Sequence, residues 1–107
     1  MLVQINTDRN IEGNRELSDQ IQDIVDSTLG RFESYVTRIE IHISDENAGK
    51  SGSNDKRCAM EARMEGRAPV AVTDNADEVL RAVTGAANKL KASLDSTIGK
   101  LRDSERR

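Results

Sequence analysis

The sequence has very few of the residues that form disulfides or stack on bases. It contains one cysteine, one proline, no tryptophan and only two aromatic residues, Phe32 and Tyr35. Because Cys58 has no second cysteine to pair with, no disulfide can form within the chain, and a reducing cytoplasm is the simplest compartment. Two aromatic residues are too few to form a row of exposed rings on which nucleic-acid bases could stack, so that mode of binding is excluded. The core is therefore predicted to be aliphatic.

The sequence also lacks a long apolar run and an excess of positive charge. No apolar stretch of about 18 residues is present, so no membrane span is expected. Residues 1–8 lack the basic and then apolar pattern of a secretory signal. The formal net charge is −3, although 33% of the residues are charged. Such a protein can hold nucleic-acid phosphates only where its positive charge is concentrated on one face.

Candidate catalytic and ligand-binding groups are sparse. His42 is the only histidine, and no second histidine or cysteine lies in register with it, so no metal site is expected. Gly49, Lys50 and Ser51 are similar to the end of a phosphate-binding loop, but Ser44 stands where that motif requires glycine, which favours a hairpin loop. Cys58 is expected to be a buried, unreactive side chain. We therefore expect no enzymatic activity, no cofactor and no small-molecule substrate.

What the sequence does contain is an ordered set of hydrophobic periods. Alternation over residues 2–6, 35–44, 57–65 and 70–72 predicts four strands. Apolar residues at spacings of three and four predict helices over 14–32 and from about 76 to 102. Asn14 is the expected N-cap of the first helix, and Thr73, Asp74 or Asn75 that of the second. These elements form a single domain over residues 1–102, followed by a polar tail over 103–107.

The order β-α-β-β-β-α predicts an α+β fold. A strand joined through a helix to the next strand implies a parallel pair with a right-handed crossover, and the two later connections suit antiparallel hairpins. The result is a four-stranded mixed sheet with two helices packed on one face. The apolar face toward the helices carries Ile39, Ile41, Ile43, Met60 and Met64. The second helix would span about 40 Å, so its last turns are expected to project beyond the sheet.

Charged side chains are divided unevenly between the two helices. Residues 14–34 contain two bases, Arg15 and Arg31, against five acids: Glu16, Asp19, Asp23, Asp26 and Glu33. The second helix carries Arg81, Lys89, Lys91, Lys100 and Arg102, and the open sheet face carries Arg38, Arg57 and Arg63. A charged helix face is usually only solvated. Phosphate binding requires several of these bases to converge in space.

Three local strings carry a family resemblance. They are VQINTDRNIE at 3–12, LGRFESYVTRI at 29–39 and NKLKASL at 88–94. Their order and spacing, together with the predicted fold, resemble the short ribosome hibernation-promoting factors. That family includes ribosome-associated inhibitor A, and its members were formerly called sigma-54 modulation proteins. The similarity extends from residue 2 to about residue 101.

The resemblance implies a layout similar to double-stranded RNA-binding domains and a cytoplasmic protein that docks on the small ribosomal subunit. It would contact 16S-type rRNA where tRNA and messenger RNA lie, and inhibit translation in resting or stressed cells by occupancy alone. Arg9, Arg31 and Lys89 match basic family positions, and Lys91 and Lys100 are nearby candidates for rRNA binding. We expect a monomer, because the C-terminal dimerisation domain of the long family form has no counterpart within these 107 residues.

The acidic first helix departs from the family pattern, in which Lys and Arg are dense on both helices. Each missing phosphate contact lowers the affinity for rRNA and makes that affinity depend less steeply on salt concentration. An alternative is therefore a protein-interaction module on the same fold, with rRNA binding lost, in which the acidic helix meets a basic protein partner.

Overall fold

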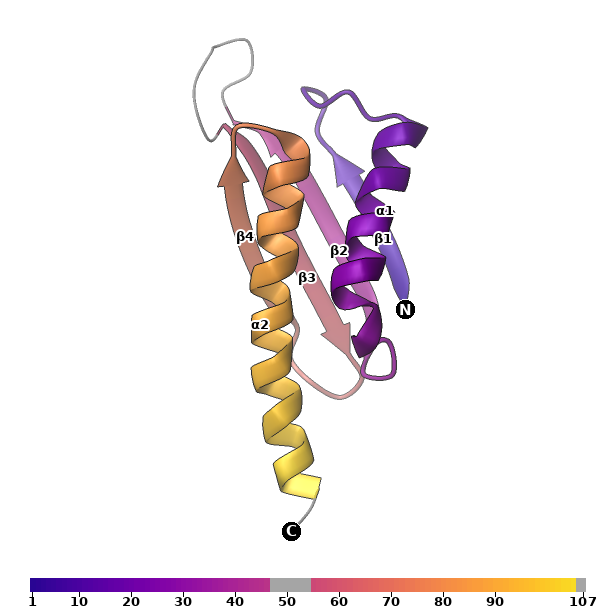
Figure 1. Ribbon diagram of the computed structural model, residues 1–107, viewed down its shortest axis with the longest axis vertical. Coiled ribbons are helices and arrows are strands. Elements are labelled where there is room, and N and C mark those ends of the chain that lie inside the picture. Colours follow the sequence, from indigo (N-terminus) through magenta and orange to yellow (C-terminus); the bar gives the residue numbers. More distant parts are fainter. Residues whose placement is uncertain (47–54, 106–107) are drawn as a thin grey trace.

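The computed structural model describes residues 1–46 and 55–105, and its element order is the predicted one. Strand β1 (Leu2–Thr7) leads into helix α1 (Arg15–Leu29) and a short 3-10 turn, η1 (Gly30–Phe32). Strands β2 (Val36–Asp45), β3 (Lys56–Met64) and β4 (Val70–Ala76) follow, and helix α2 (Val79–Glu105) comes last (Figure 1). The hairpin loop predicted around Lys50 lies outside the described residues.

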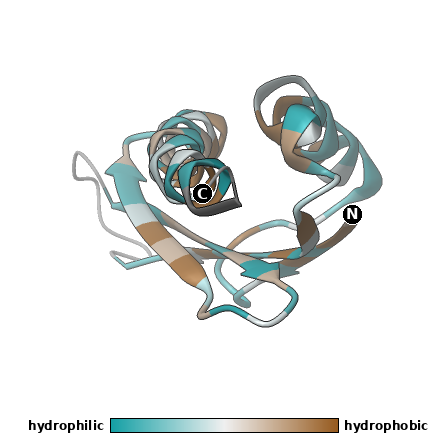
Figure 2. Ribbon diagram, turned by 90° about the horizontal axis from the view of Figure 1, so that it is seen from below, coloured by the Kyte–Doolittle hydropathy of each residue, from teal (hydrophilic) through white to brown (hydrophobic). Residues whose placement is uncertain are grey.

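The four strands form one mixed sheet in the order β1-β2-β3-β4. Strand β1 runs parallel to β2, with Ile5 opposite Ile41, and the crossover between them is α1. Strands β2, β3 and β4 are antiparallel neighbours, with Ile41 opposite Met60 and Met60 opposite Val72. Figure 2 shows both helices on the same face of this sheet. The predicted α+β architecture is therefore confirmed.

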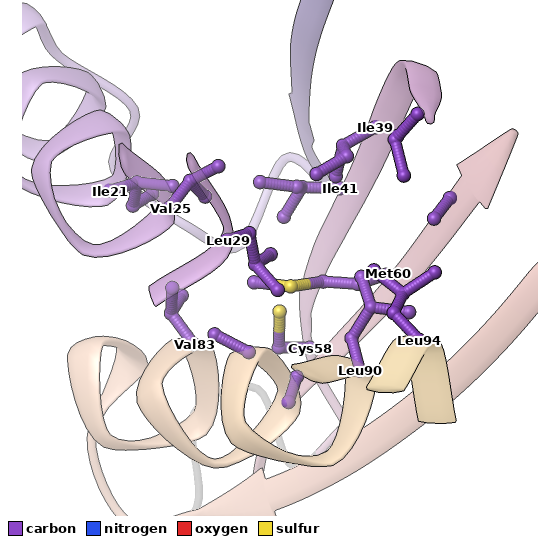
Figure 3. Packing of buried hydrophobic residues seen from close by; sticks show 14 of the residues in the cluster. Ile21, Val25, Leu29, Ile39, Ile41, Cys58, Met60, Val83, Leu90 and Leu94 are labelled. Carbon is purple, nitrogen blue, oxygen red and sulfur yellow. The ribbon is translucent and has the colours of Figure 1, made fainter. Parts of the chain in front are cut away.

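The core between helices and sheet is aliphatic, as the scarcity of aromatic residues predicted. Ile39, Ile41, Ile43, Met60 and Met64 are all buried against the two helical stripes. Figure 3 shows α1 and α2 directing their apolar side chains at this face, with Leu29 and Leu90 among them. Cys58 is fully buried in the same cluster, and burial, aided by the nearby Asp74 carboxylate, raises the pKa of its thiol to about 12. A thiol with so high a pKa is not a nucleophile at neutral pH.

The start of α1 is as predicted, and the start of α2 is not. Asn14 caps α1, since its side-chain oxygen accepts a hydrogen bond from the Leu17 N–H at 2.8 Å. The predicted caps of α2, Thr73, Asp74 and Asn75, lie instead in β4, which continues to Ala76. Strand pairing explains the difference. The β3–β4 ladder extends to Lys56 opposite Ala76, and backbone groups that have ladder partners stay extended rather than turning into a helix.

Helix α2 is longer than the sheet on which it packs. Its 27 residues correspond to about 40 Å at 1.5 Å per residue. Figure 1 shows its last turns continuing past the ends of the strands, as the sequence predicted. The helix runs to Glu105, so residues 103–105, which were expected to belong to a polar tail, continue it.

Candidate nucleic-acid interface

The arginines on the open sheet face are neutralised by neighbouring acids. Arg38 forms an ion pair with Glu40 at 2.8 Å and also contacts the side chain of Gln4. Arg63 lies 2.9 Å from Glu61 and 3.6 Å from Glu40. Hydrogen bonding to Glu61 also holds the pKa of Arg63 above its usual value.

The third arginine of that face, Arg57, approaches Glu46 at 3.7 Å. Each of the three bases therefore has a carboxylate within ion-pair distance. The open sheet face is a mixed-charge network and not a positive surface for phosphates.

Lys89 connects α2 to β4. Its Nζ donates to the Thr73 carbonyl and approaches the Asp74 carboxylate, both at 2.9 Å. Asp74 lies on the helix-facing side of β4, opposite Cys58 in the register. Gly85 allows this approach, because a Cβ at that position would lie 2.6 Å from the Asp74 Cγ. Lys89 is still 55% exposed, but its charge is already opposed.

Arg31 connects the end of α1 to α2. Its guanidinium nitrogen Nη2 lies 2.6 Å from each carboxylate oxygen of Asp95. The same guanidinium lies over the Phe32 ring, 4.5 Å from the centroid. Both side chains of the ion pair are about half exposed, so it contributes only about 0.2–1 kcal/mol. Arg31 thus links η1 to α2, and Asp95 already opposes its positive charge.

The other three candidate rRNA-binding bases have no acidic partner within ion-pair distance among the described residues. Within residues 1–46 and 55–105, Arg9, Lys91 and Lys100 are exposed and form no ion pair. Arg9 lies in a defined turn, because Asp8 accepts hydrogen bonds from the backbone N–H groups of Asn10 and Asp45 at 3.0 and 3.2 Å.

The five candidates do not converge on one surface. Lys89 faces β4, and Lys91, two residues on, is rotated by about 200° to the opposite flank of α2. That flank also carries Asp95, the partner of Arg31. Lys100 is eleven residues from Lys89, close to three full turns, and so returns to the flank of Lys89. Arg9 follows the C-terminal end of β1, which is the sheet edge opposite β4, where Lys89 lies.

The structure adds one base that the sequence pattern did not single out. Arg67, in the turn between β3 and β4, lines a hollow of about 230 Å³ with Thr97, Lys100 and Leu101. In the sequence it reads as an ordinary turn residue after Gly66. Its proximity to Lys100 depends on α2 passing over that turn.

Helix α1 presents a row of carboxylates to solvent. Glu16, Asp19, Asp23 and Asp26 are exposed and follow one another at spacings of three and four. Asp26 accepts a hydrogen bond from Gln22 at 2.9 Å. In the described part of the chain none of the four forms an ion pair with a base. Negative charge of this kind repels phosphate, so this row of α1 disfavours contact with RNA.

Two other kinds of feature, a metal-ligand cluster and a membrane-spanning helix, are absent from the described residues. His42 is exposed on the open sheet face, and no three His, Cys, Asp or Glu residues among those described gather as metal ligands. None of the described helices has the length and apolarity needed to cross a membrane.

Solved structures share this fold at low sequence identity. The N-terminal domain of Protein Y from Thermus thermophilus superposes with a TM-score of 0.71 at 15% identity, covering 91% of this chain and 99% of that domain. A ribosomal subunit interface protein from Coxiella burnetii gives a TM-score of 0.71 at 14% identity, covering 92% and 99%. At such identities the likeness establishes the fold alone. No curated protein sequence matches the chain.

A family model does match the sequence. The model describes the sigma 54 modulation protein / S30EA ribosomal protein family, and the match spans residues 9–102. It therefore includes all five candidate bases and every element except β1 and the last three residues of α2. This is the family that the three sequence strings indicated. The chain belongs to the sigma 54 modulation protein / S30EA ribosomal protein family.

Proposed function

We propose that this protein is a hibernation-type factor that binds the small ribosomal subunit in the cytoplasm and inhibits translation by occupancy. The observation that carries the proposal is the family match over residues 9–102. The chemistry of the molecule agrees with it, because exposed basic side chains of the described residues can contact rRNA phosphates. A monomer would occupy the path of tRNA and messenger RNA without any bond being made or broken.

The phosphate contacts in this proposal come chiefly from Arg9, Lys91 and Lys100. These bases are exposed and unopposed within the described chain, so their full charge is available to RNA. Lys89 and Arg31 contribute less, because Asp74 and Asp95 already oppose their charges at 2.9 and 2.6 Å. They orient α2 and hold the other bases in place.

So few contacts predict a moderate salt dependence. Each phosphate contact releases counterions, and three contacts would lower the association constant about 20- to 40-fold between 50 and 200 mM salt. Five equal contacts would lower it more than about 100-fold over the same range. The salt slope therefore counts how many bases of the protein touch phosphate.

The test is co-sedimentation of the protein with purified small subunits at several salt concentrations. Lys91→Glu should weaken binding and flatten the salt slope. Lys89→Gln, which leaves the unopposed bases in place, should change binding less. Absence of any binding to small subunits at low salt would contradict the proposal.

The acidic row of α1 supports one alternative, a module that recognises a basic protein. Its four carboxylates lack ion-pair partners in the described chain, so they are available to a cationic surface. Asp19→Lys combined with Asp23→Lys separates the two functions. Ribosome binding should be unchanged or stronger in this variant. Loss of a cellular interaction in this variant, with Lys89 and Lys91 dispensable, would instead favour the protein partner.

A further inference from the structure

We propose that an RNA-phosphate site lies at the end of the sheet, beneath the projecting turns of α2. Two adjoining hollows there share Arg67 and Leu101, and together we call them the turn groove. The larger, about 260 Å³, is also lined by Ser34, Tyr35, Thr37, Met64 and Glu65. The smaller, about 230 Å³, adds Thr97 and Lys100. This inference rests on the proposed function and assigns part of the ribosome contact to a defined place.

The backbone holds Arg67 in position. Gly66 has a φ of 73°, in the left-handed region that glycine adopts without strain. The Arg67 N–H donates to the Met64 carbonyl at 3.3 Å, which closes the tight β3–β4 turn. A charged side chain on a closed turn loses less conformational entropy on binding than one on an open loop.

The length of α2 supplies the other side of the groove. Without the turns beyond the sheet, Lys100 and Leu101 would not reach the β3–β4 turn (Figure 1). Arg102 lies on the same segment, where its Nε donates to the Tyr35 hydroxyl at 3.2 Å. Its guanidinium is 5.7 Å from the centroid of the Tyr35 ring. The projecting helix therefore brings basic residues to a turn that also carries one.

Charge distinguishes the turn groove from the rest of the surface. Arg67 and Lys100 are exposed and form no ion pair with any described residue, whereas Glu65 is the one acid that lines the groove. In a protein of net charge −3, a concave surface with two unopposed cations and one acid attracts anions locally.

The shape and the polar groups of the groove favour a phosphodiester backbone. The two hollows adjoin at Arg67 and Leu101, so together they form an elongated surface and not a single enclosed pocket. Ser34 and Tyr35 line the same surface, and hydroxyl groups of this kind can donate to phosphate oxygens. A strand of rRNA laid along the two hollows would place phosphate next to Arg67 and Lys100.

The experiment compares two variants with the same change in charge. Arg67→Glu/Lys100→Glu removes the bases of the groove. Arg57→Glu/Arg81→Glu is the matched control, because both of its arginines are exposed and ion-paired to acids elsewhere on the molecule. Arg67→Gln/Lys100→Gln tests the same site without adding negative charge. Circular dichroism establishes that all three variants are folded.

Binding is measured by sedimentation with small subunits and with protein-free small-subunit rRNA. We expect the groove variant to lose at least tenfold in affinity for both targets, with a log–log salt slope shallower by about 1.4–1.8, as two lost phosphate contacts predict. The glutamine variant should show the same change in slope. The control should bind nearly as the unmodified protein does.

Four outcomes separate the possibilities. Unmodified protein that fails to bind small subunits contradicts the proposed function itself. Normal binding by the unmodified protein and equal affinities of groove variant and control would overturn the turn groove alone. A loss seen with intact subunits but not with protein-free rRNA would assign the groove to a ribosomal protein and overturn the RNA assignment. Tight binding of adenosine triphosphate that shifts the NMR signals of Arg67 and Thr97, without competing with rRNA, would also overturn it.

Discussion

Replacing Gly85 with alanine should destabilise the protein, although alanine normally favours a helix. Gly85 lies in α2 where the helix passes β4, and a Cβ there would overlap Oδ2 of Asp74 and lie 2.6 Å from its Cγ. Asp74 can yield only by moving from its position beside Lys89. Overpacking of this kind costs about 1–3 kcal/mol. The alanine itself contributes about 0.8–1 kcal/mol in a helix interior.

The net effect on the free energy of unfolding is a loss of up to about 2 kcal/mol. Gly99→Ala in the same helix is the matched control, because nothing lies within 4 Å of the Cβ that it would add. That variant should gain about 0.8–1 kcal/mol. Each kcal/mol corresponds to a shift in Tm of about 4–8 °C for a domain near this size.

Urea denaturation followed by far-UV circular dichroism measures both variants, since the chain has no tryptophan to report by fluorescence. In an Asp74→Ala background the obstacle is gone, so Gly85→Ala should become stabilising and match Gly99→Ala. A Gly85→Ala variant as stable as Gly99→Ala in the unmodified background would refute the close approach of α2 to β4.

Three further predictions concern the core and the first helix. Ile41→Asp should unfold the domain, because Ile41 is fully buried and a carboxylate there would be unpaired; a folded variant of normal stability by circular dichroism would contradict the orientation of the sheet. Asn14→Ala should cost about 1 kcal/mol through loss of the cap to the Leu17 N–H, whereas Asn14→Gly should cost only a few tenths in urea denaturation. Cys58, with a pKa near 12, should resist Ellman's reagent at neutral pH until urea unfolds the protein; rapid reaction of the native thiol would show that its burial is wrong.

The faces of the strands and helices could be predicted from the sequence because they depend on local periodicity. Side chains alternate along a strand, and apolar residues at spacings of three and four share a helix face. The inward positions of Ile41 and Met60 followed from these two rules, and both residues are buried. The cap at Asn14 was equally local, since the hydrogen bond it makes spans only three residues.

The boundary between β4 and α2 could not be predicted in this way. Thr73, Asp74 and Asn75 are good helix caps by residue type. Their conformation is decided by the partner strand, because Arg57 and Cys58 of β3 pair with Asn75 and Asp74. Local preference yields to backbone hydrogen bonds that only the assembled sheet supplies.

The sequence by itself determined the fold, the family strings and the list of available bases. Only the tertiary structure decided which of those bases remain unopposed. Arg31 meets Asp95, 64 residues away, and Lys89 meets Asp74 across the α2–β4 contact. Arg67 and Lys100 come together because a long helix crosses a distant turn. Ion pairing depends on distance in space, and residue spacing along the chain fixes that distance only within a single helix or strand.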